Sequence, residues 1–141
     1  MRKLFFTAII LLLSVGFMTA QKAAIPAVVK AKIAALYPNA KKVEWTVEKD
    51  NYEAEIEQKG SPDVSVDLNA KGEVLETETD IKVAELPEAA RVYITKNLGN
   101  AKIKEAAKIV KADNSVMYEA QIGKKDYLFD DNGRFLKIVV K

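Results

Sequence analysis

The feature that most constrains the fold of this chain is an internal repeat. The segment IPAVVKAKIAALYPNAKKVEW, which begins at Ile25, aligns with LPEAARVYITKNLGNAKIKEA, which begins at Leu86, at an offset of 61 residues. Farther along, YEAEI (52–56) matches YEAQI (118–122) at an offset of 66, and Gly72 with Gly133 restores the offset of 61. We place the five extra residues of the second copy in a turn at 111–115. A repeat of this length indicates one structural unit built twice.

Each copy begins with a predicted helix. Proline at positions 26 and 87 suits a first helical turn, where the missing N–H group would have no partner in any case. Apolar residues then recur at helical spacing: Val29, Ile33, Leu36 and Tyr37 in the first copy, and Ala90, Ile94 and Leu98 in the second. Pro38 ends the first helix and Gly99 ends the second.

After each helix the apolar period changes to two. Val43, Trp45 and Val47 alternate with polar residues, and the alternation resumes at 52–56, 64–68 and 73–79, with turn residues between these segments. This pattern is typical of antiparallel strands with one buried face. We therefore expect an α+β fold, a tandem repeat of one helix plus a four-stranded antiparallel sheet, with the repeats at 24–82 and 83–141.

Residues 1–20 have the pattern of a secretory signal peptide. Arg2 and Lys3 precede a fourteen-residue apolar run at 4–17, and Ala20 offers a small residue for cleavage before Gln21. The run is shorter than the ~20 residues of a membrane-spanning helix. We expect residues 21–141 to be exported, to the periplasm or the extracellular medium, without a membrane span.

Composition excludes several functional classes. The chain has no Cys and no His, which removes disulfides, Cys/His metal sites and His-dependent catalytic triads. Without Arg2 and Lys3 it carries 20 basic and 20 acidic residues, so its net charge does not favour nucleic acid as a partner. It contains no phosphate-binding loop, dinucleotide fingerprint or nucleophile elbow, and we expect no cofactor and no catalytic residue.

The two copies share a sequence pattern that extends over residues 24–141. The pattern is (I/L)-P, an amphipathic helix, Y-P-N-A-K or L-G-N-A-K, then Y-E-A-x-I and a final D/N-x-x-G-x-(V/F)-L. It resembles the PepSY-like family of secreted β-lactamase-inhibitor-like proteins. The resemblance implies a helix packed on an antiparallel sheet, twice, with sheet faces available for binding. It also implies a relation to PepSY domains of peptidase propeptides, and it implies no catalytic residue. The second copy departs from the first in having Ala106 for Trp45 and Gly99 for Pro38.

The polar side of the first four predicted strands is the candidate binding surface. Residues 21–82 hold nine basic and twelve acidic groups, a net charge of −3, whereas residues 83–141 hold eleven and eight, a net charge of +3. Opposed charges of this kind can steer a partner that is itself charge-polarised. Tyr93 lies off the apolar stripe of its helix, so we expect it to be exposed and include it. The candidate residues are Glu44, Glu48, Glu53, Glu55, Glu57, Asp67, Glu76, Glu78 and Tyr93.

We expect these carboxylates to be equally solvated, which does not suit acid–base catalysis, since that chemistry needs two carboxyl groups with different pKa values. We also expect no metal site. The segment 67–72 mimics the start of an EF-hand loop, but Lys71 stands where an oxygen ligand belongs. The flanking alternation predicts strands, so we interpret the segment as a hairpin turn in which Gly72 takes a positive φ.

A folded, exported chain without reactive groups is most compatible with binding. We expect a non-enzymatic protein-binding module whose partner is a secreted or periplasmic protein, with inhibition of a peptidase or other hydrolase as the activity to test. The alternative is a periplasmic protein that binds a small ligand or a cation on the acidic sheet face.

Overall fold

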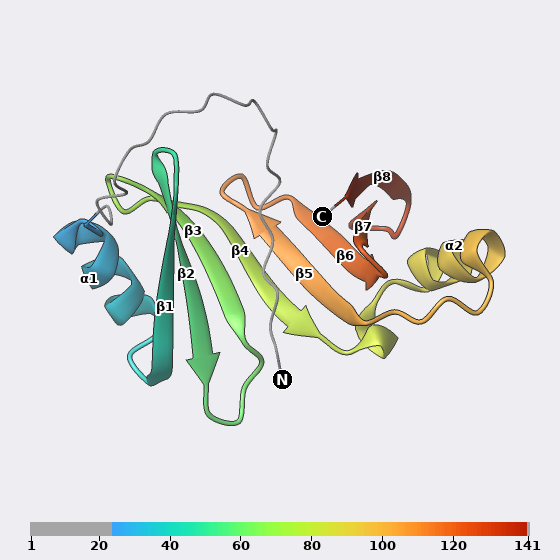
Figure 1. Cartoon of the computed structure of the whole chain (residues 1–141), viewed down its shortest axis with the longest axis horizontal. Coiled ribbons are helices and arrows are strands. Elements are labelled where there is room, and N and C mark those ends of the chain that lie inside the picture. The colour runs from blue at the N-terminus through green and yellow to red at the C-terminus, as the bar shows by residue number, and fades with distance from the viewer. Residues whose placement is uncertain (1–23, 141) are drawn as a thin grey trace, which may run out of the picture.

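The computed structural model describes residues 24–140 and contains both predicted units (Figure 1). The signal peptide predicted for residues 1–20 lies outside the described residues. The first unit comprises α1 (Ala27–Leu36), β1 (Ala40–Glu48), β2 (Asn51–Gln58), β3 (Val64–Asn69) and β4 (Val74–Ile81). The second comprises the short 3-10 helix η1 (Val83–Glu85), α2 (Glu88–Leu98), β5 (Glu105–Lys111), β6 (Val116–Ile122), β7 (Lys125–Asp130) and β8 (Phe135–Val140).

All eight strands form one antiparallel sheet whose strand order follows the chain from β1 to β8. The two units meet where β4 pairs with β5, from Glu76 opposite Lys111 to Ile81 opposite Ala106. Figure 1 shows α1 beside the first strands and α2 beside the last ones, with β4 and β5 between them. The expected tandem repeat is thus confirmed, and its two four-stranded sheets are joined edge to edge.

Each helix buries one apolar stripe against its own four strands. In the first unit Val29 and Ile33 of α1 are 0% and 2% exposed and share a core with Ala54 and Ile56 of β2. In the second unit Ala90 and Ile94 of α2 occupy the corresponding places. Four aromatic residues also pack beneath the helices, half-buried or buried: Trp45, Tyr52, Tyr118 and Tyr127. Leu36 continues the helical spacing of Val29 and Ile33, but it is 47% exposed.

Both helices cover the same face of the sheet. Residues directly opposite one another on paired strands lie on the same face of the sheet. Val66 lies on the face on which α1 packs, and it is followed on the same face by its successive partners Thr77, Val110 and Val116. Val116 lies on the same side of β6 as Ala120, which belongs to the core beneath α2. The opposite face of the sheet is therefore covered by neither helix.

The β3–β4 and β7–β8 turns repeat one another in detail. The Asn69 side-chain oxygen accepts hydrogen bonds from the backbone N–H groups of Lys71 and Glu73, at 2.9 and 3.1 Å. In the second copy the Asp130 carboxylate accepts from the backbone of Asn132 and Arg134, at 3.0 and 2.8 Å. Gly72 and Gly133 take φ of +78° and +80°, as the turn interpretation predicts.

The extra residues of the second unit lie in the β5–β6 hairpin, as expected. Trp45 pairs with Ala54 in the first unit, and Ala106 pairs with Ala120 at the same place in the second. The first hairpin then closes through a turn at 49–50, whereas the second closes only at 111–115. The second hairpin is therefore longer, while the strand pairing below it is unchanged.

Candidate functional site

The eight predicted carboxylates share the face of β1–β4 that neither helix covers, here called the acidic face. Ala54 and Ile56 point toward α1, so their neighbours Glu53, Glu55 and Glu57 point away from it. The register extends this face to the other strands, because Glu55 lies opposite Glu44, Glu53 opposite Asp67, and Asp67 opposite Glu76. Alternation in the sequence was sufficient to predict this common placement.

Lysines of the chain itself pair with the outer members of the acidic face. Lys42 Nζ lies 2.7 Å from Glu44 Oε1, and Lys41 Nζ lies 2.8 Å from Glu57 Oε1. At the junction between the two units, Lys111 Nζ of β5 lies 3.0 Å from Glu76 Oε2 of β4. These side chains are partly or largely solvent-exposed, so the pairs contribute little to folding.

The centre of the acidic face is a small pocket, here called the acidic pocket. Glu53, Ser65, Asp67, Glu76 and Glu78 line it, and its cavity volume is about 30 Å³. Glu53, Asp67 and Glu76 form one row across β2, β3 and β4, and Ser65 and Glu78 form the next row. Residues directly opposite one another in a sheet have Cβ atoms roughly 5 Å apart, so these rows hold like charges close together.

Burial and repulsion change the acidity of three of these carboxyl groups. Burial raises the pKa of Glu53 to about 7, and the negative charges of Asp67 and Glu55 raise it further. The nearby Ser65 hydroxyl offsets part of this rise. The pKa of Asp67 rises to about 6, mainly through burial and then through Glu76, and Lys111 opposes the rise.

Glu78 has the least solvated carboxyl group of the three. Burial raises its pKa to about 7, and the charges of Glu76 and Asp80 add to the rise. The expectation of an equally solvated face is therefore wrong at the centre. Alternation identifies the side of a strand to which a residue belongs, but it does not show how far neighbouring side chains cover that residue.

Ser65 is the lining residue that the predicted site omits. Its side chain is buried, at 5% exposure, among longer carboxylates. Its oxygen makes no hydrogen bond of acceptable geometry with any residue in the part of the chain that the structure describes, although the Glu53 carboxyl is close. The available sequence signal was a single small hydroxyl residue within a row of acidic ones.

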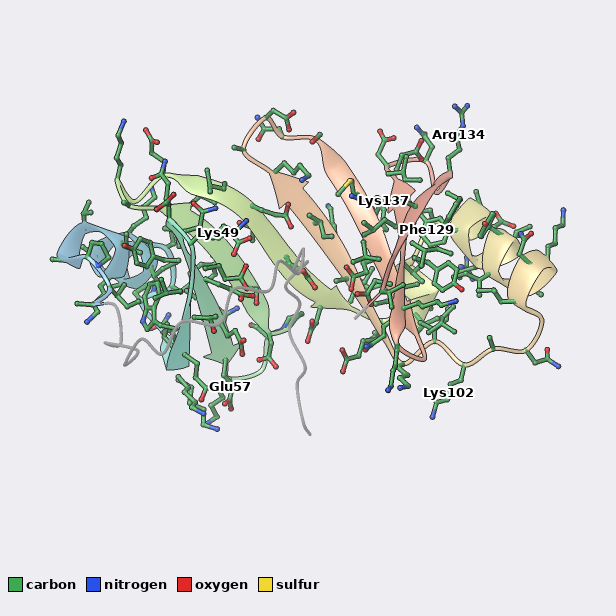
Figure 2. All side chains as sticks on the ribbon, turned by 45° about the horizontal axis from the view of Figure 1, so that its top comes forward. Lys49, Glu57, Lys102, Phe129, Arg134 and Lys137 are labelled. Carbon is green, nitrogen blue, oxygen red and sulfur yellow. The ribbon has the colours of Figure 1, made fainter. Side chains whose placement is uncertain are left out.

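The prediction that Tyr93 is exposed is wrong. Tyr93 is half-buried and packs against the core beneath α2. Its ring stacks on that of Phe135, with centroids 4.7 Å apart, and meets the ring of Phe129 edge-on at 5.7 Å. Figure 2 shows Phe129 on the side of the sheet where α2 lies. Tyr93 thus lies across the sheet from the acidic face and does not join it.

The uncovered face continues into the second unit with different chemistry. Glu119 of β6 lies opposite Leu128 of β7, and Leu128 lies opposite Lys137 of β8. Next to the acidic pocket, Glu78 of β4 lies opposite Ile109 of β5, which is 3% exposed. The same sheet face is thus carboxylate-rich on β1–β4 and mixed on β5–β8.

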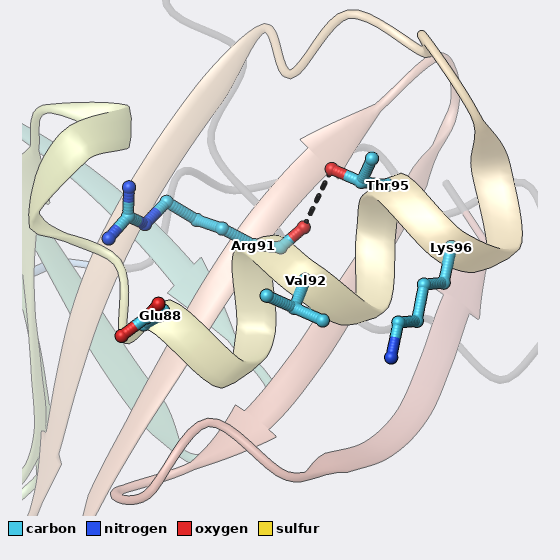
Figure 3. A pocket seen from close by; sticks show the side chains of 5 residues that line it. All are labelled: Glu88, Arg91, Val92, Thr95 and Lys96. Atoms are coloured by element: carbon cyan, nitrogen blue, oxygen red, sulfur yellow. Dashed lines mark hydrogen bonds between the residues drawn. The ribbon is translucent and has the colours of Figure 1, made fainter.

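A second hollow lies along α2, on the other side of the sheet (Figure 3). Its volume is about 320 Å³, and its five lining residues all belong to this helix: Glu88, Arg91, Val92, Thr95 and Lys96. Each of them is exposed, and Thr95 Oγ1 donates a hydrogen bond to the backbone oxygen of Arg91 at 3.0 Å. The hollow is a solvated helix face and brings no reactive groups together.

Neither a metal-binding group nor a membrane span is evident within residues 24–140. No three Asp or Glu side chains of this part converge as ligands for a metal ion. The segment that mimics an EF-hand loop is flanked by β3 and β4, and its Asn69 oxygen is occupied by backbone N–H groups. None of the helices in this range has the length and apolar character needed to cross a bilayer.

Sequence comparison assigns the fold and the repeat to a family. A family described as "Putative beta-lactamase-inhibitor-like, PepSY-like" matches residues 18–76 and again residues 63–137. The chain belongs to the PepSY-like family. The two overlapping matches agree with a unit that occurs twice. No curated protein sequence matches the chain.

Solved structures share the architecture of this PepSY-like chain. One, titled "putative periplasmic proteins" from Bacteroides eggerthii, has a TM-score of 0.73 at 20% identity and covers 84% of this chain and 90% of its own. A DUF2874 family protein from Bacteroides uniformis has a TM-score of 0.71 at 19% identity, with coverages of 82% and 88%. A BLIP-like protein from Bacteroides fragilis has a TM-score of 0.64 at 21% identity, with coverages of 84% and 89%. At these identities the similarity establishes the fold.

Proposed function

We propose that this PepSY-like protein is an exported, non-enzymatic binding module that holds a partner protein on the uncovered face of its sheet. The observation that carries the proposal is the placement of both helices on one face, which leaves a continuous opposite face rich in carboxylates. The partner class that we propose is a secreted or periplasmic hydrolase, which the module would inhibit.

The size of the face supports a protein partner. Eight strands spaced about 4.8 Å apart and roughly six residues long make a face of about 38 by 20 Å, or roughly 760 Å². Stable protein interfaces use about 800 Å² of each partner. One unit supplies only half of this area, so a partner of standard size would extend past the β4–β5 junction, where Ala107 and Ile109 of the same face are buried and add little accessible surface.

The family and its structural neighbours support the same class. The family description is inhibitor-like, one neighbour is titled as a periplasmic protein, and another is titled BLIP-like. The signal-peptide pattern of residues 1–20 supports export.

The acidic pocket has one property of a catalytic site, because raised carboxyl pKa values are common among acid–base catalysts. Its size argues for binding instead. Sites for organic ligands occupy roughly 300–1,000 Å³, about ten times the 30 Å³ found here. A substrate could not enter it, whereas a group at the end of a partner's side chain could.

The test is capture from periplasm and culture medium with the chain from Gln21 to Lys141, which contains every described helix and strand. Two charge-reversal variants are compared with the unaltered bait. Glu53→Lys with Glu55→Lys changes the acidic face, and Glu88→Lys with Asp131→Lys makes the same charge change at exposed positions outside it.

We expect one hydrolase to bind the unaltered bait and the control variant, and to lose activity when bound. The acidic-face variant should associate at least about tenfold more slowly, with weaker salt dependence, because it removes electrostatic steering. Equal association kinetics for both variants would contradict the proposal. Loss of binding in both variants would show that net charge, rather than the acidic face, governs capture.

A further inference from the structure

The acidic pocket has the dimensions of one small polar group. A water molecule needs roughly 10–15 Å³ of cavity volume, so about 30 Å³ accommodates one or two groups of that size. A lysine ammonium group is similar in size to water and carries three N–H donors. An arginine guanidinium group is a planar fork with five donors and fills more space.

Three of the four carboxylates that line the pocket have no ion pair with a cation of the described residues. The ion pairs of the acidic face engage Glu44, Glu57 and Glu76. Within residues 24–140, no Lys or Arg forms an ion pair with Glu53, Asp67 or Glu78. Three carboxyl groups without an ion pair in the described part of the chain therefore line the cavity, and the nearest cation there, Lys111, is paired with Glu76 at its rim.

The Ser65 hydroxyl is a second, independent indication of a ligand. It is 95% buried, it lines the cavity, and its oxygen makes no hydrogen bond of acceptable geometry with the described residues, although it lies close enough to the Glu53 carboxyl to lower the pKa of that group. Buried hydroxyl groups without a partner are uncommon in folded proteins, since leaving one unsatisfied costs about 1–3 kcal/mol. An N–H donor placed in the cavity would satisfy this oxygen.

We propose that the acidic pocket receives the ammonium group of a lysine from the partner protein, held by Glu53, Asp67 and Glu78 and by the oxygen of Ser65. This inference rests on the proposed function, because it assigns the contact at the centre of the same face. It also requires that the partner carry a lysine that projects from its surface toward β2–β4.

Two alternative occupants fit less well. A bound metal ion would need three or more ligands within about 2.0–2.6 Å, and no three acidic side chains of residues 24–140 are placed to provide them. An ammonium group accepts longer contacts of about 2.7–2.9 Å and can be held by fewer carboxylates at once. An arginine would need a slot wide enough for its planar fork, which exceeds this cavity.

Binding of a lysine should depend on pH, because the carboxyl groups must be ionised to hold an ammonium group. With pKa values of about 7 for Glu53 and Glu78 and about 6 for Asp67, the three pocket carboxyls are largely ionised at pH 8 and largely protonated at pH 5. The charged groups that face them are Glu48 on β1, Glu55 on β2, Glu76 and Asp80 on β4, Lys111 on β5 and Asp126 on β7.

The experiment is an NMR titration of the chain from Gln21 to Lys141, followed at the side-chain carboxyl carbons. The probe is Nα-acetyl-lysine methylamide, compared with the norleucine, arginine and ornithine analogues and with Ca²⁺. The protein variants are Ser65→Ala and Glu78→Gln, with Glu88→Gln as the matched control on the exposed face of α2.

We expect the lysine probe to shift Glu53, Asp67 and Glu78 in a saturable manner, and to bind at least about tenfold more weakly at pH 5 than at pH 8. Glu78→Gln should weaken binding about tenfold and Ser65→Ala several-fold, while Glu88→Gln should leave it unchanged. Equal response to norleucine, tighter binding of arginine, or displacement of lysine by micromolar Ca²⁺ would each overturn the inference.

The failure of this inference is distinguishable from failure of the proposed function. A captured partner that binds the unaltered protein, Ser65→Ala and Glu78→Gln equally, but loses the Glu53→Lys/Glu55→Lys variant, would refute the pocket and leave the face as the binding surface. A lysine probe that titrates the pocket, while no captured protein depends on the face, would refute the proposed function and the protein partner but leave the pocket as a site for an ammonium group.

Discussion

The two units of this protein are alike on the side of the helices and unlike on the opposite side. Beneath the helices, Leu68 and Phe129 occupy matching buried places, and Asn69 and Asp130 organise matching turns. On the uncovered face, Glu53 of the first unit corresponds to Glu119 of the second, yet their strand partners are Asp67 and Leu128. The repeat thus preserves the core while the uncovered face differs between its two copies.

The residues of the uncovered face, unlike those of the core, are not explained by the requirements of folding. A core position must fill space between helix and sheet, so both units need apolar side chains there. Burying carboxylates opposite one another is unfavourable to the sheet, and their pKa values are raised first by burial and then by the neighbouring negative charges. The first unit bears this cost at its acidic pocket, which is why we assign the central contact to it.

The largest effects should come from removing matched core residues. Phe129→Ala should lower the free energy of unfolding by about 3–5 kcal/mol and Leu68→Ala by about 2–5 kcal/mol, because both side chains are 0% exposed. Urea unfolding monitored by circular dichroism would measure both. Since one continuous sheet joins the units, each variant should show one transition for the whole chain. Two separate transitions would show that the units fold independently.

Glycines at the matching turns should differ in how strictly they are required. A Cβ atom at Gly133 would lie 2.8 Å from the backbone nitrogen of Ala90, whereas at Gly72 the nearest atom, the oxygen of Val28, is 3.2 Å away. Gly60 has φ of +75° and open space around it, so it isolates the cost of backbone strain. We expect the free energy of unfolding to fall by at least about 3 kcal/mol in Gly133→Ala, by about 2 kcal/mol in Gly72→Ala and by about 1 kcal/mol in Gly60→Ala. Equal losses in thermal unfolding would show that strain alone governs these turns.

Removing one pocket carboxyl should change how stability depends on pH. Burial raises the pKa of Glu78 from 4.5 to about 7, so the folded state binds its proton more tightly and loses stability as pH rises through this range. The free energy of unfolding of Glu78→Gln, compared with that of the unaltered protein, should therefore be higher at pH 8 than at pH 4 by up to about 3 kcal/mol. Unfolding of both proteins across this pH range measures the gain. A pH-independent difference would contradict the burial of Glu78.

The ion pair at the junction should contribute least. Lys111→Met removes the partner of Glu76 between β4 and β5, where both side chains are partly exposed. We expect the free energy of unfolding to fall by less than about 1 kcal/mol, and by still less at high salt. A larger loss in urea unfolding would indicate that the junction depends on this charge pair as well as on its backbone pairing.

Periodicity predicted the helices, the strands, the repeat and the common face of the eight carboxylates, because each of these follows from which side of an element a residue occupies. It failed where a result depends on distances between elements. Tyr93 lies off the helical stripe, but the ring of Phe135, from the last strand, reaches it. Leu36 follows the stripe, but it lies at the end of α1 and remains exposed. The pocket at Ser65 depends on how neighbouring carboxylates pack, which alternation does not encode.

The strand order also affects how the chain can acquire its structure. Each strand pairs with the one before it, and only the junction of β4 with β5 spans a long segment, the one that contains α2. Mostly local contacts favour rapid folding. A chain delivered from its N-terminus could complete β1–β4 before the later residues emerge, and could then add one hairpin after another to an existing edge. In such growth each new hairpin is stabilised by the strands that have already formed.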